Sequence, residues 1–125
     1  MEAAVSAKSQ CESRQVVPAN LAAPDVDLAQ ILVSKGFDPT RKSAWLIEGV
    51  IMYLPPSSAL LLLDKVSKLC AQGSAVMHDG VSLAAANAGI NVCGAPFIFG
   101  HDDYKGLWTS YGLDIVSYID CGNLH

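Results

Sequence analysis

The stretch SAWLIEGVIMYLPP at residues 43–56 decides the fold of this chain, because a short apolar run in it ends at one carboxylate and one glycine. Ala44 to Ile47 is unbroken apolar sequence, which is typical of parallel strands whose two faces are both covered. Glu48 follows at the carboxyl end, and the ligand crevices of open α/β sheets lie just beyond such ends. Gly49 lets the backbone approach a ligand closely. The stretch therefore predicts a buried strand that ends at a small-molecule site.

A helix and a second strand are predicted directly after this stretch. Its two closing prolines set the start of the helix, Ser57 or Ser58 can cap it, and apolar residues at helical spacing continue to Cys70. Gly73 ends the helix, and 75–78 reads as the next buried strand. Strand, helix and strand in this order predict a right-handed βαβ crossover in a parallel sheet.

The N-terminal part is predicted to supply one more strand and one more helix. Residues 1–14 read as a leader or a frayed helix tail, and 15–18 reads as a short strand that ends at a proline. Asn20 and Leu21 follow at its carboxyl end. A helix is then predicted from Asp25 and Asp27 in its first turn to a glycine stop at position 36.

The C-terminal part is predicted to hold two helices and a last strand. The helices are expected over 81–88 and from 102 through Trp108, with a stop at Gly112. The glycine-rich segment 89–100 is predicted to be a loop that could cover a crevice. Residues 113–119 are predicted to form the final strand.

The sequence of the central stretch resembles that of a known protein family. Gly36-Phe37-Asp38-Pro39, followed by Ala44-Trp45-Leu46-Ile47-Glu48-Gly49 and then Tyr53-Leu54-Pro55, closely resembles the leucine carboxyl methyltransferase family, which carries GFDP and then W-L-x-E-G-x-x-x-Y-L-P. Weaker similarity extends from about Val16 to Gly112. The resemblance implies an α/β fold: a partial class I methyltransferase (Rossmann-like) domain, with a mostly parallel sheet and flanking helices. Residues 15–125 would be its C-terminal part, with the first two strands and the last strand missing.

The resemblance also implies an activity and a cofactor. Members use S-adenosyl-L-methionine to methylate an oxygen, often the carboxylate of a small molecule or of a protein C terminus. Glu48 and the pair Asn20-Leu21 would be cofactor-binding, the pair at the adenine end. The family usually has aspartate where this chain has Asn20, so a neutral hydrogen bond of about 1 kcal/mol would replace a charged one of about 1.5 to 3 kcal/mol. Cofactor affinity is therefore expected to fall modestly.

One absence in the sequence argues against activity of the chain by itself. No glycine-rich turn follows a strand and opens a helix, and in such folds that turn meets the cofactor. We therefore expect no turnover by the isolated chain, and catalytic residues cannot be assigned. The alternative is a non-catalytic remnant or an interaction subunit. Without the missing strands, 44–47 becomes a sheet edge, which predicts self-association through that unpaired edge, aggregation or a molten state.

Other polar residues have ordinary interpretations beside the functional ones. Tyr53 is expected to pack its ring, and His78 to be a core or rim histidine rather than a general base. The run from His101 through two aspartates is expected to be a solvated helix start and not a metal site. The alternative for Glu48 is a helix-capping or solvated loop carboxylate, and the alternative for Asn20 is an ordinary turn residue.

Composition and charge limit which binding partners and which cellular compartment are expected for the chain. The net charge of -4 gives no reason to expect nucleic acid or an anionic membrane surface, and the longest apolar run, Ala59 to Leu63, is too short to span a bilayer. No secretory segment opens the chain, so a cytoplasmic location is expected. The four cysteines are widely spaced, which favours free thiols in a reducing compartment over a disulfide, although sequence leaves both open.

Overall fold

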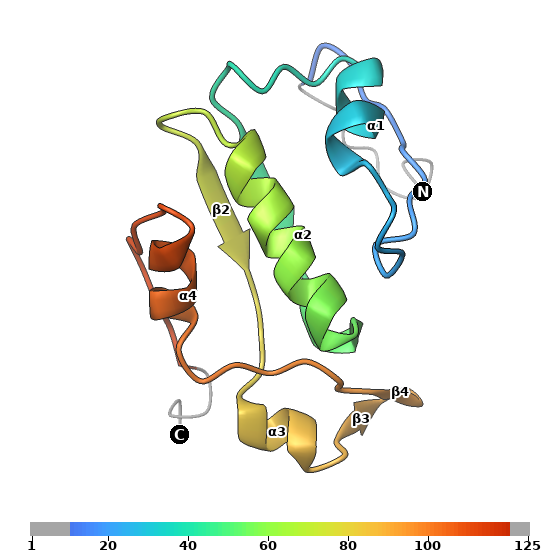
Figure 1. Cartoon of the computed structure of the whole chain (residues 1–125), viewed down its shortest axis with the longest axis vertical. Helices are drawn as coiled ribbons and strands as arrows, with labels where there is room; N and C mark the ends of the chain where they lie inside the picture. Colours follow the sequence, from blue (N-terminus) through green and yellow to red (C-terminus); the bar gives the residue numbers. More distant parts are fainter. Residues whose placement is uncertain (1–10, 121–125) are drawn as a thin grey trace.

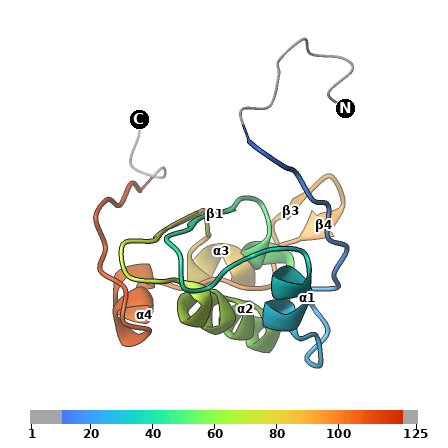
Figure 2. The ribbon, with the colours of Figure 1, turned by 90° about the horizontal axis from the view of Figure 1, so that it is seen from above.

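The computed structural model describes residues 11–120 and arranges them in two layers. A small parallel sheet lies on one side of a layer of helices, which Figure 2 shows beneath the sheet. The strands of this sheet are β1 (Ala44–Ile47) and β2 (Ala75–His78), and the helices beneath them are α1 (Leu28–Ser34), α2 (Pro56–Leu69) and α4 (Tyr104–Ser110).

The predicted strand, helix and strand unit around the central stretch is confirmed. β1 and β2 pair in parallel, with Ala44 opposite Ala75 and Ile47 opposite His78. They are connected by α2, which Figure 1 shows beside β2. The amide of Ala75 donates to the carbonyl of Ser43 over 2.9 Å. The α/β fold class predicted from the sequence therefore holds for this part of the chain, as a small parallel sheet with helices.

The core lies between the sheet and α2. Side chains at helical spacing along α2 meet Ile47 of β1 and residues from the 3-10 turn η2 (Ile51–Tyr53). Ile51, Leu63 and Val66 are almost completely buried. The other buried residues of this cluster are Leu28, Ala59, Leu62, Phe99, Tyr104 and Trp108.

The prediction that both faces of β1 are covered is wrong for the described residues. Burial alternates along the strand: Trp45 and Ile47 face α2, whereas Ala44 and Leu46 are exposed. Leu46 keeps 63% of its surface, because the helices of residues 11–120 that pack on the sheet lie on its other face. The apolar run predicts a strand covered on both faces, but only alternate residues contact the core.

Helix α1 ends before Gly36 as the sequence predicts, but it begins only at Leu28, so Asp27 is its cap and Asp25 lies before it rather than in the first turn. The strand predicted before it does not form. The carboxylate of Asp27 accepts from the amide of Gln30 over 3.0 Å at the helix start, and Gly36 adopts a φ of 102° just past its end. Residues 15–18 run without a strand partner in the described part of the chain, and Val16 is 75% exposed. A strand needs a neighbour to satisfy its backbone, and this segment has none there.

The start of α2 differs from the prediction in its cap. Pro55 occupies the cap position and no side chain bonds the first turn, so neither Ser57 nor Ser58 caps the helix. The hydroxyl of Ser58 donates instead to the carbonyl of Ala22 over 3.0 Å, which ties the N-terminal segment to α2.

The segment 81–100 contains more structure than a helix and a loop. α3 (Leu83–Asn87) is capped by the hydroxyl of Ser82. Within the predicted loop, β3 (Asn91–Val92) and β4 (Ala95–Pro96) form a short antiparallel hairpin. The turn between them places two residues, Cys93 and Gly94, at positive φ, which suits a two-residue hairpin turn.

The last predicted strand does not form. After α4 the segment 113–119 has no strand partner among residues 11–120, but Leu113 and Ile115 pack against the core. Val116, by contrast, is 98% exposed. The alternating apolar residues of 113–119 therefore correspond to two contacts with the core, by Leu113 and Ile115, and not to a hydrogen-bonded strand.

Two sequence predictions fall partly outside the described residues. Positions 1–10 of the predicted leader and Cys121 lie there, so the predictions for these residues are not tested. Within 11–120, Cys70 and Cys93 are free thiols. No helix in this described range has the length and apolar character needed to cross a membrane.

Candidate functional site

Two carboxylates follow the two parallel strands at the same end of the sheet. Ile47 and His78 form the last pair of the ladder, and the next residues are Glu48 and Asp79. Both carboxylates are exposed. In parallel sheets, this carboxyl edge is where ligand crevices lie, so the position predicted for Glu48 is confirmed while its role stays a prediction.

Asp79 holds the turn that follows β1. Its two carboxylate oxygens accept from the amide of Gly49 at 2.9 and 3.1 Å, and its own amide donates to the carbonyl of Ile47 over 3.3 Å. Gly49 has a φ of 65°, a backbone conformation that glycine adopts without strain. The residue pair therefore fixes the backbone on the C-terminal side of Glu48 and leaves the Glu48 side chain at the exposed edge.

The structure supports the turn interpretation of Asn20. Its carboxamide oxygen accepts from the amide of Ala22 over 3.1 Å, a local side-chain turn, and the residue is exposed. The premise that it ends a strand is wrong, because 15–18 forms none in the described chain. That Asn20 and Glu48 both bind the cofactor stays a prediction.

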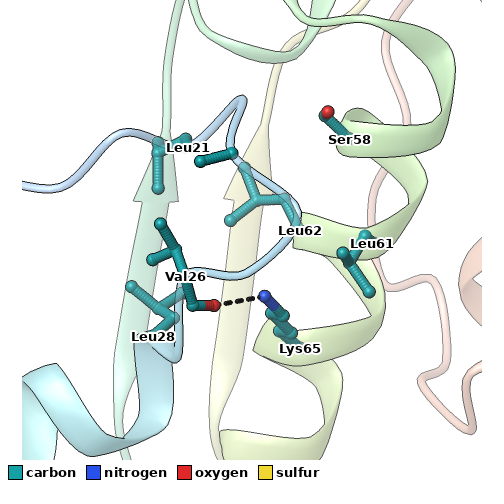
Figure 3. Close-up of a pocket in the computed structure, with 8 residues that line it drawn as sticks. Leu21, Val26, Leu28, Ser58, Leu61, Leu62 and Lys65 are labelled. Atoms are coloured by element: carbon teal, nitrogen blue, oxygen red, sulfur yellow. Dashed lines mark hydrogen bonds between the residues drawn. The ribbon is translucent and has the colours of Figure 1, made fainter.

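Leu21 takes part in a different feature, a shallow hollow between residues 21–28 and helix α2. Figure 3 shows Leu21, Val26 and Leu28 on one side and α2 side chains on the other. The Lys65 ammonium group donates to the carbonyl of Val26 across it. This hydrogen bond and the apolar contacts tie the segment before α1 to the core.

His78 has both ring nitrogens engaged in the fold. Its Nδ1 lies 2.8 Å from the carbonyl oxygen of Asp79, and its Nε2 accepts from the indole N–H of Trp108 over 2.6 Å. A general base needs a free nitrogen directed at its substrate. The expectation of a structural histidine is therefore confirmed.

Aromatic side chains of α4 surround His78, and sequence reasoning did not identify them. The ring centroids of Tyr104 and Trp108 lie 5.3 and 5.5 Å from that of His78. The Tyr104 hydroxyl donates to the carbonyl of Val81 over 2.9 Å, and burial raises the pKa of this hydroxyl. Their spacing of four residues places both rings on one helix face, a signal that predicts a shared aromatic surface but not its contact with His78.

The acidic run before α4 is the start of a helix, as expected. The carboxylate of Asp103 accepts from the amide of Gly106 over 2.9 Å, and Asp102 accepts from the amide of Leu83 at the start of α3. His101 accepts from the amide of Asp103 through Nδ1. In residues 11–120, no group of three metal-ligating side chains is close enough to hold an ion.

Tyr53 packs as expected. Its ring lies 5.7 Å from that of Phe97, and the side chain is half-buried. The amides of Ile98 and Phe99 donate to the carbonyl of Met52, so the segment after the β3–β4 hairpin is attached to the η2 turn. This attachment places the hairpin segment next to the turn that follows Glu48 and Gly49.

Comparisons with known proteins agree with the resemblance seen in the sequence. A relative from Saccharopolyspora erythraea, named "Putative S-adenosyl-L-methionine-dependent methyltransferase", is 40% identical over 66% of this chain and 27% of its own length. A relative of the same description from Mycolicibacterium smegmatis is 34% identical over 78% of this chain and 30% of its own length. The chain thus matches less than a third of the length of these relatives. No solved structure matches it significantly.

The family model for leucine carboxyl methyltransferase matches residues 3–67, which is more than half of the chain. This match includes the stretch that forms β1 and the turn at Glu48 and Gly49. The chain therefore belongs to the leucine carboxyl methyltransferase family.

Proposed function

We propose that this chain supplies part of the cofactor site of an S-adenosyl-L-methionine-dependent O-methyltransferase. The observation that carries the proposal is the position of Glu48, which is exposed at the carboxyl end of β1 beside a turn held by Asp79. A carboxylate there can accept hydrogen bonds from a ligand in the crevice. Membership of the family and the names of the relatives support S-adenosyl-L-methionine as that ligand.

Asn20 and Leu21 are proposed to meet the adenine end of the same cofactor. Asn20 is exposed, and its NH₂ group remains available as a donor while its oxygen holds the turn at Ala22. To accept a hydrogen bond from adenine, the side-chain oxygen of Asn20 would have to accept two hydrogen bonds or give up the one from the amide of Ala22. That cost supports a weaker contact here than an aspartate would give.

The proposed reaction transfers a methyl group to an oxygen acceptor, specifically the carboxylate of a small molecule or of a protein C terminus. When bound, S-adenosyl-L-methionine supplies an electrophilic methyl group. A carboxylate acceptor is already deprotonated at neutral pH, so the protein needs to align the reactants more than to move a proton. This agrees with the engagement of both His78 nitrogens in structural contacts. We place the reaction in the cytoplasm.

We further propose that the cofactor site is incomplete in this chain alone, so that the isolated chain is inactive. The match to less than a third of each relative and the absence of a glycine-rich turn in the sequence support this. A second candidate function, an interaction subunit that retains part of the fold, is favoured by the exposed sheet face at Leu46.

The test is a chimera in which residues 11–120 of this chain replace the matching segment of the Saccharopolyspora erythraea relative. The affinity for S-adenosyl-L-methionine is measured by calorimetry for the chimera and for its Glu48→Gln and Asp25→Asn variants. Glu48→Gln should weaken binding by about tenfold or more, because it removes a charged acceptor worth about 1.5 to 3 kcal/mol. Asp25→Asn, a matched loss of an exposed carboxylate, should leave the affinity unchanged. Equal affinities for all three proteins would overturn the proposed role of Glu48.

A further inference from the structure

One residue, Asp79, holds the backbone on both sides of Glu48. Its amide donates over 3.3 Å to the carbonyl of Ile47, which belongs to the peptide group before Glu48. Its carboxylate oxygens accept at 2.9 and 3.1 Å from the amide of Gly49, which belongs to the peptide group after Glu48. A residue has only two soft backbone torsions, and these set the relation between its two flanking peptide planes. Because Asp79 holds both planes, it sets the direction in which the Glu48 side chain leaves the strand.

Helix α4 in turn fixes the short segment that contains Asp79. Nδ1 of His78 lies 2.8 Å from the carbonyl oxygen of Asp79, and the indole of Trp108 donates to Nε2 of the same ring. Two residues after Asp79, the carbonyl of Val81 accepts from the hydroxyl of Tyr104 over 2.9 Å. The amide, the carbonyl and the carboxylate of Asp79 therefore all have partners within the fold, and the segment is attached to α4 on both sides of it.

We propose that Asp79 is a positioning residue, which directs the Glu48 carboxylate toward the ligand crevice without itself contacting the bound cofactor. The inference rests on the proposed function, in which Glu48 accepts hydrogen bonds from S-adenosyl-L-methionine. A group that is already held in its binding orientation loses less conformational freedom when the ligand binds. Part of the affinity that Glu48 provides therefore depends on Asp79, although the two residues lie in different strand-end turns.

Direct contact with the ligand is the alternative role for Asp79, because its side chain is exposed at the same edge of the sheet. The geometry favours positioning, since both carboxylate oxygens share the Gly49 amide and would have to turn away from it to reach a ligand. The two roles differ in how Asp79 and Glu48 combine. A residue that acts through Glu48 has no further effect once the Glu48 carboxylate is removed, whereas a separate ligand contact weakens binding by the same factor with or without it.

The experiment is a double-mutant cycle on S-adenosyl-L-methionine affinity, measured by calorimetry in the chimera described above. Asp79→Ala should weaken binding by about threefold to tenfold where Glu48 is present, and by less than about twofold in the Glu48→Gln background. Asp79→Asn keeps one acceptor oxygen for the Gly49 amide and should recover part of the loss. Equal factors in both backgrounds, or no effect of Asp79→Ala where Glu48→Gln weakens binding, would overturn this inference alone. An unchanged affinity in Glu48→Gln would overturn the proposed function and this inference with it.

A matched substitution separates positioning from a general loss of stability. The carboxylate of Asp27 accepts from the amide of Gln30 over 3.0 Å at the start of α1, so Asp27→Ala removes the same kind of hydrogen bond. This variant should leave cofactor affinity unchanged. Amide hydrogen exchange without cofactor locates each loss, because Gly49 should exchange faster only in Asp79→Ala and Gln30 only in Asp27→Ala. Unchanged exchange of Gly49 in Asp79→Ala, or equal losses of affinity in the two variants, would overturn the positioning role.

Discussion

Trp108 donates its indole N–H to Nε2 of His78 over 2.6 Å, which connects helix α4 to the carboxyl end of β2. Because Nε2 accepts this hydrogen bond, the ring proton of the neutral imidazole must be on Nδ1. From there it donates to the carbonyl of Asp79, 2.8 Å away. The histidine is therefore fixed in one tautomer next to the residue that holds Gly49.

The first prediction is that the neutral imidazole of His78 carries its proton on Nδ1. Long-range proton–nitrogen NMR should show a protonated Nδ1 and an unprotonated Nε2. Trp108→Phe removes the donor and should produce a mixture of tautomers. Trp45→Phe removes an indole N–H that donates to Ser43 instead, so it should leave His78 unchanged. A predominant Nε2–H form in the unmodified chain would contradict the contact.

The second prediction concerns cysteine reactivity. Burial raises the pKa of the Cys70 thiol at the end of α2, whereas Cys93 is exposed in the β3–β4 turn. Alkylation requires the thiolate, so Cys70 should react about tenfold or more slowly than Cys93 near neutral pH. Peptide mass spectrometry after brief iodoacetamide treatment measures both rates in one sample. Equal rates would show that the C-terminal end of α2 is not packed as described.

The third prediction is a loss of stability at alkaline pH caused by Tyr104. Burial, the largest cause, raises the pKa of its hydroxyl above the unfolded value of about 10. The folded state therefore favours the protonated form, so its contribution is fully present below pH of about 10 and is lost as pH rises through the folded pKa. Urea unfolding of the chimera should show this decline, and Tyr104→Phe should reduce it. Tyr53→Phe, which removes the hydroxyl of a ring that packs on Phe97, is the control, and an unchanged decline in Tyr104→Phe would contradict the assignment.

The strand and helix around the central stretch could be predicted from sequence because their signals are local. The apolar run before Glu48, the prolines at the start of α2 and the glycine after α1 each act on neighbouring residues. The strands predicted at 15–18 and 113–119 failed for the opposite reason. A strand depends on a partner far along the chain, so β-prone sequence such as Val16 and Val116 gives no strand where that partner is lacking.

The same distinction applies to the candidate site. The place of Glu48 at a strand end follows from the order of residues alone. The bridge from Asp79 to the amide of Gly49 joins residues 30 positions apart, and it depends on the register of the two strands and on a turn at positive φ. The contact of Trp108 with His78 likewise joins residues 30 positions apart, and no local pattern indicates it.

The fourth prediction is that the isolated chain self-associates through the outer edge of β1, because this edge has no strand partner within residues 11–120 and a second copy can pair with it. Sedimentation velocity over the micromolar range should show species larger than a monomer. Leu46→Lys should reduce their amount, since charge on an edge strand opposes pairing. Val33→Lys adds the same charge on α1 and should not. A sharp, cooperative melt of a monomer at micromolar concentration would contradict this prediction.

The most direct measurement is calorimetric titration of S-adenosyl-L-methionine into the isolated 125-residue chain and, in parallel, into the chimera that restores the unmatched part of the domain. Membership of the leucine carboxyl methyltransferase family, with only part of the cofactor site in this chain, predicts saturable binding by the chimera and none by the chain alone. S-adenosylhomocysteine release should follow the same pattern when a set of carboxylate acceptors is supplied. Tight binding or multiple turnovers by the isolated chain, or no binding by a folded chimera whose parent binds, would contradict it.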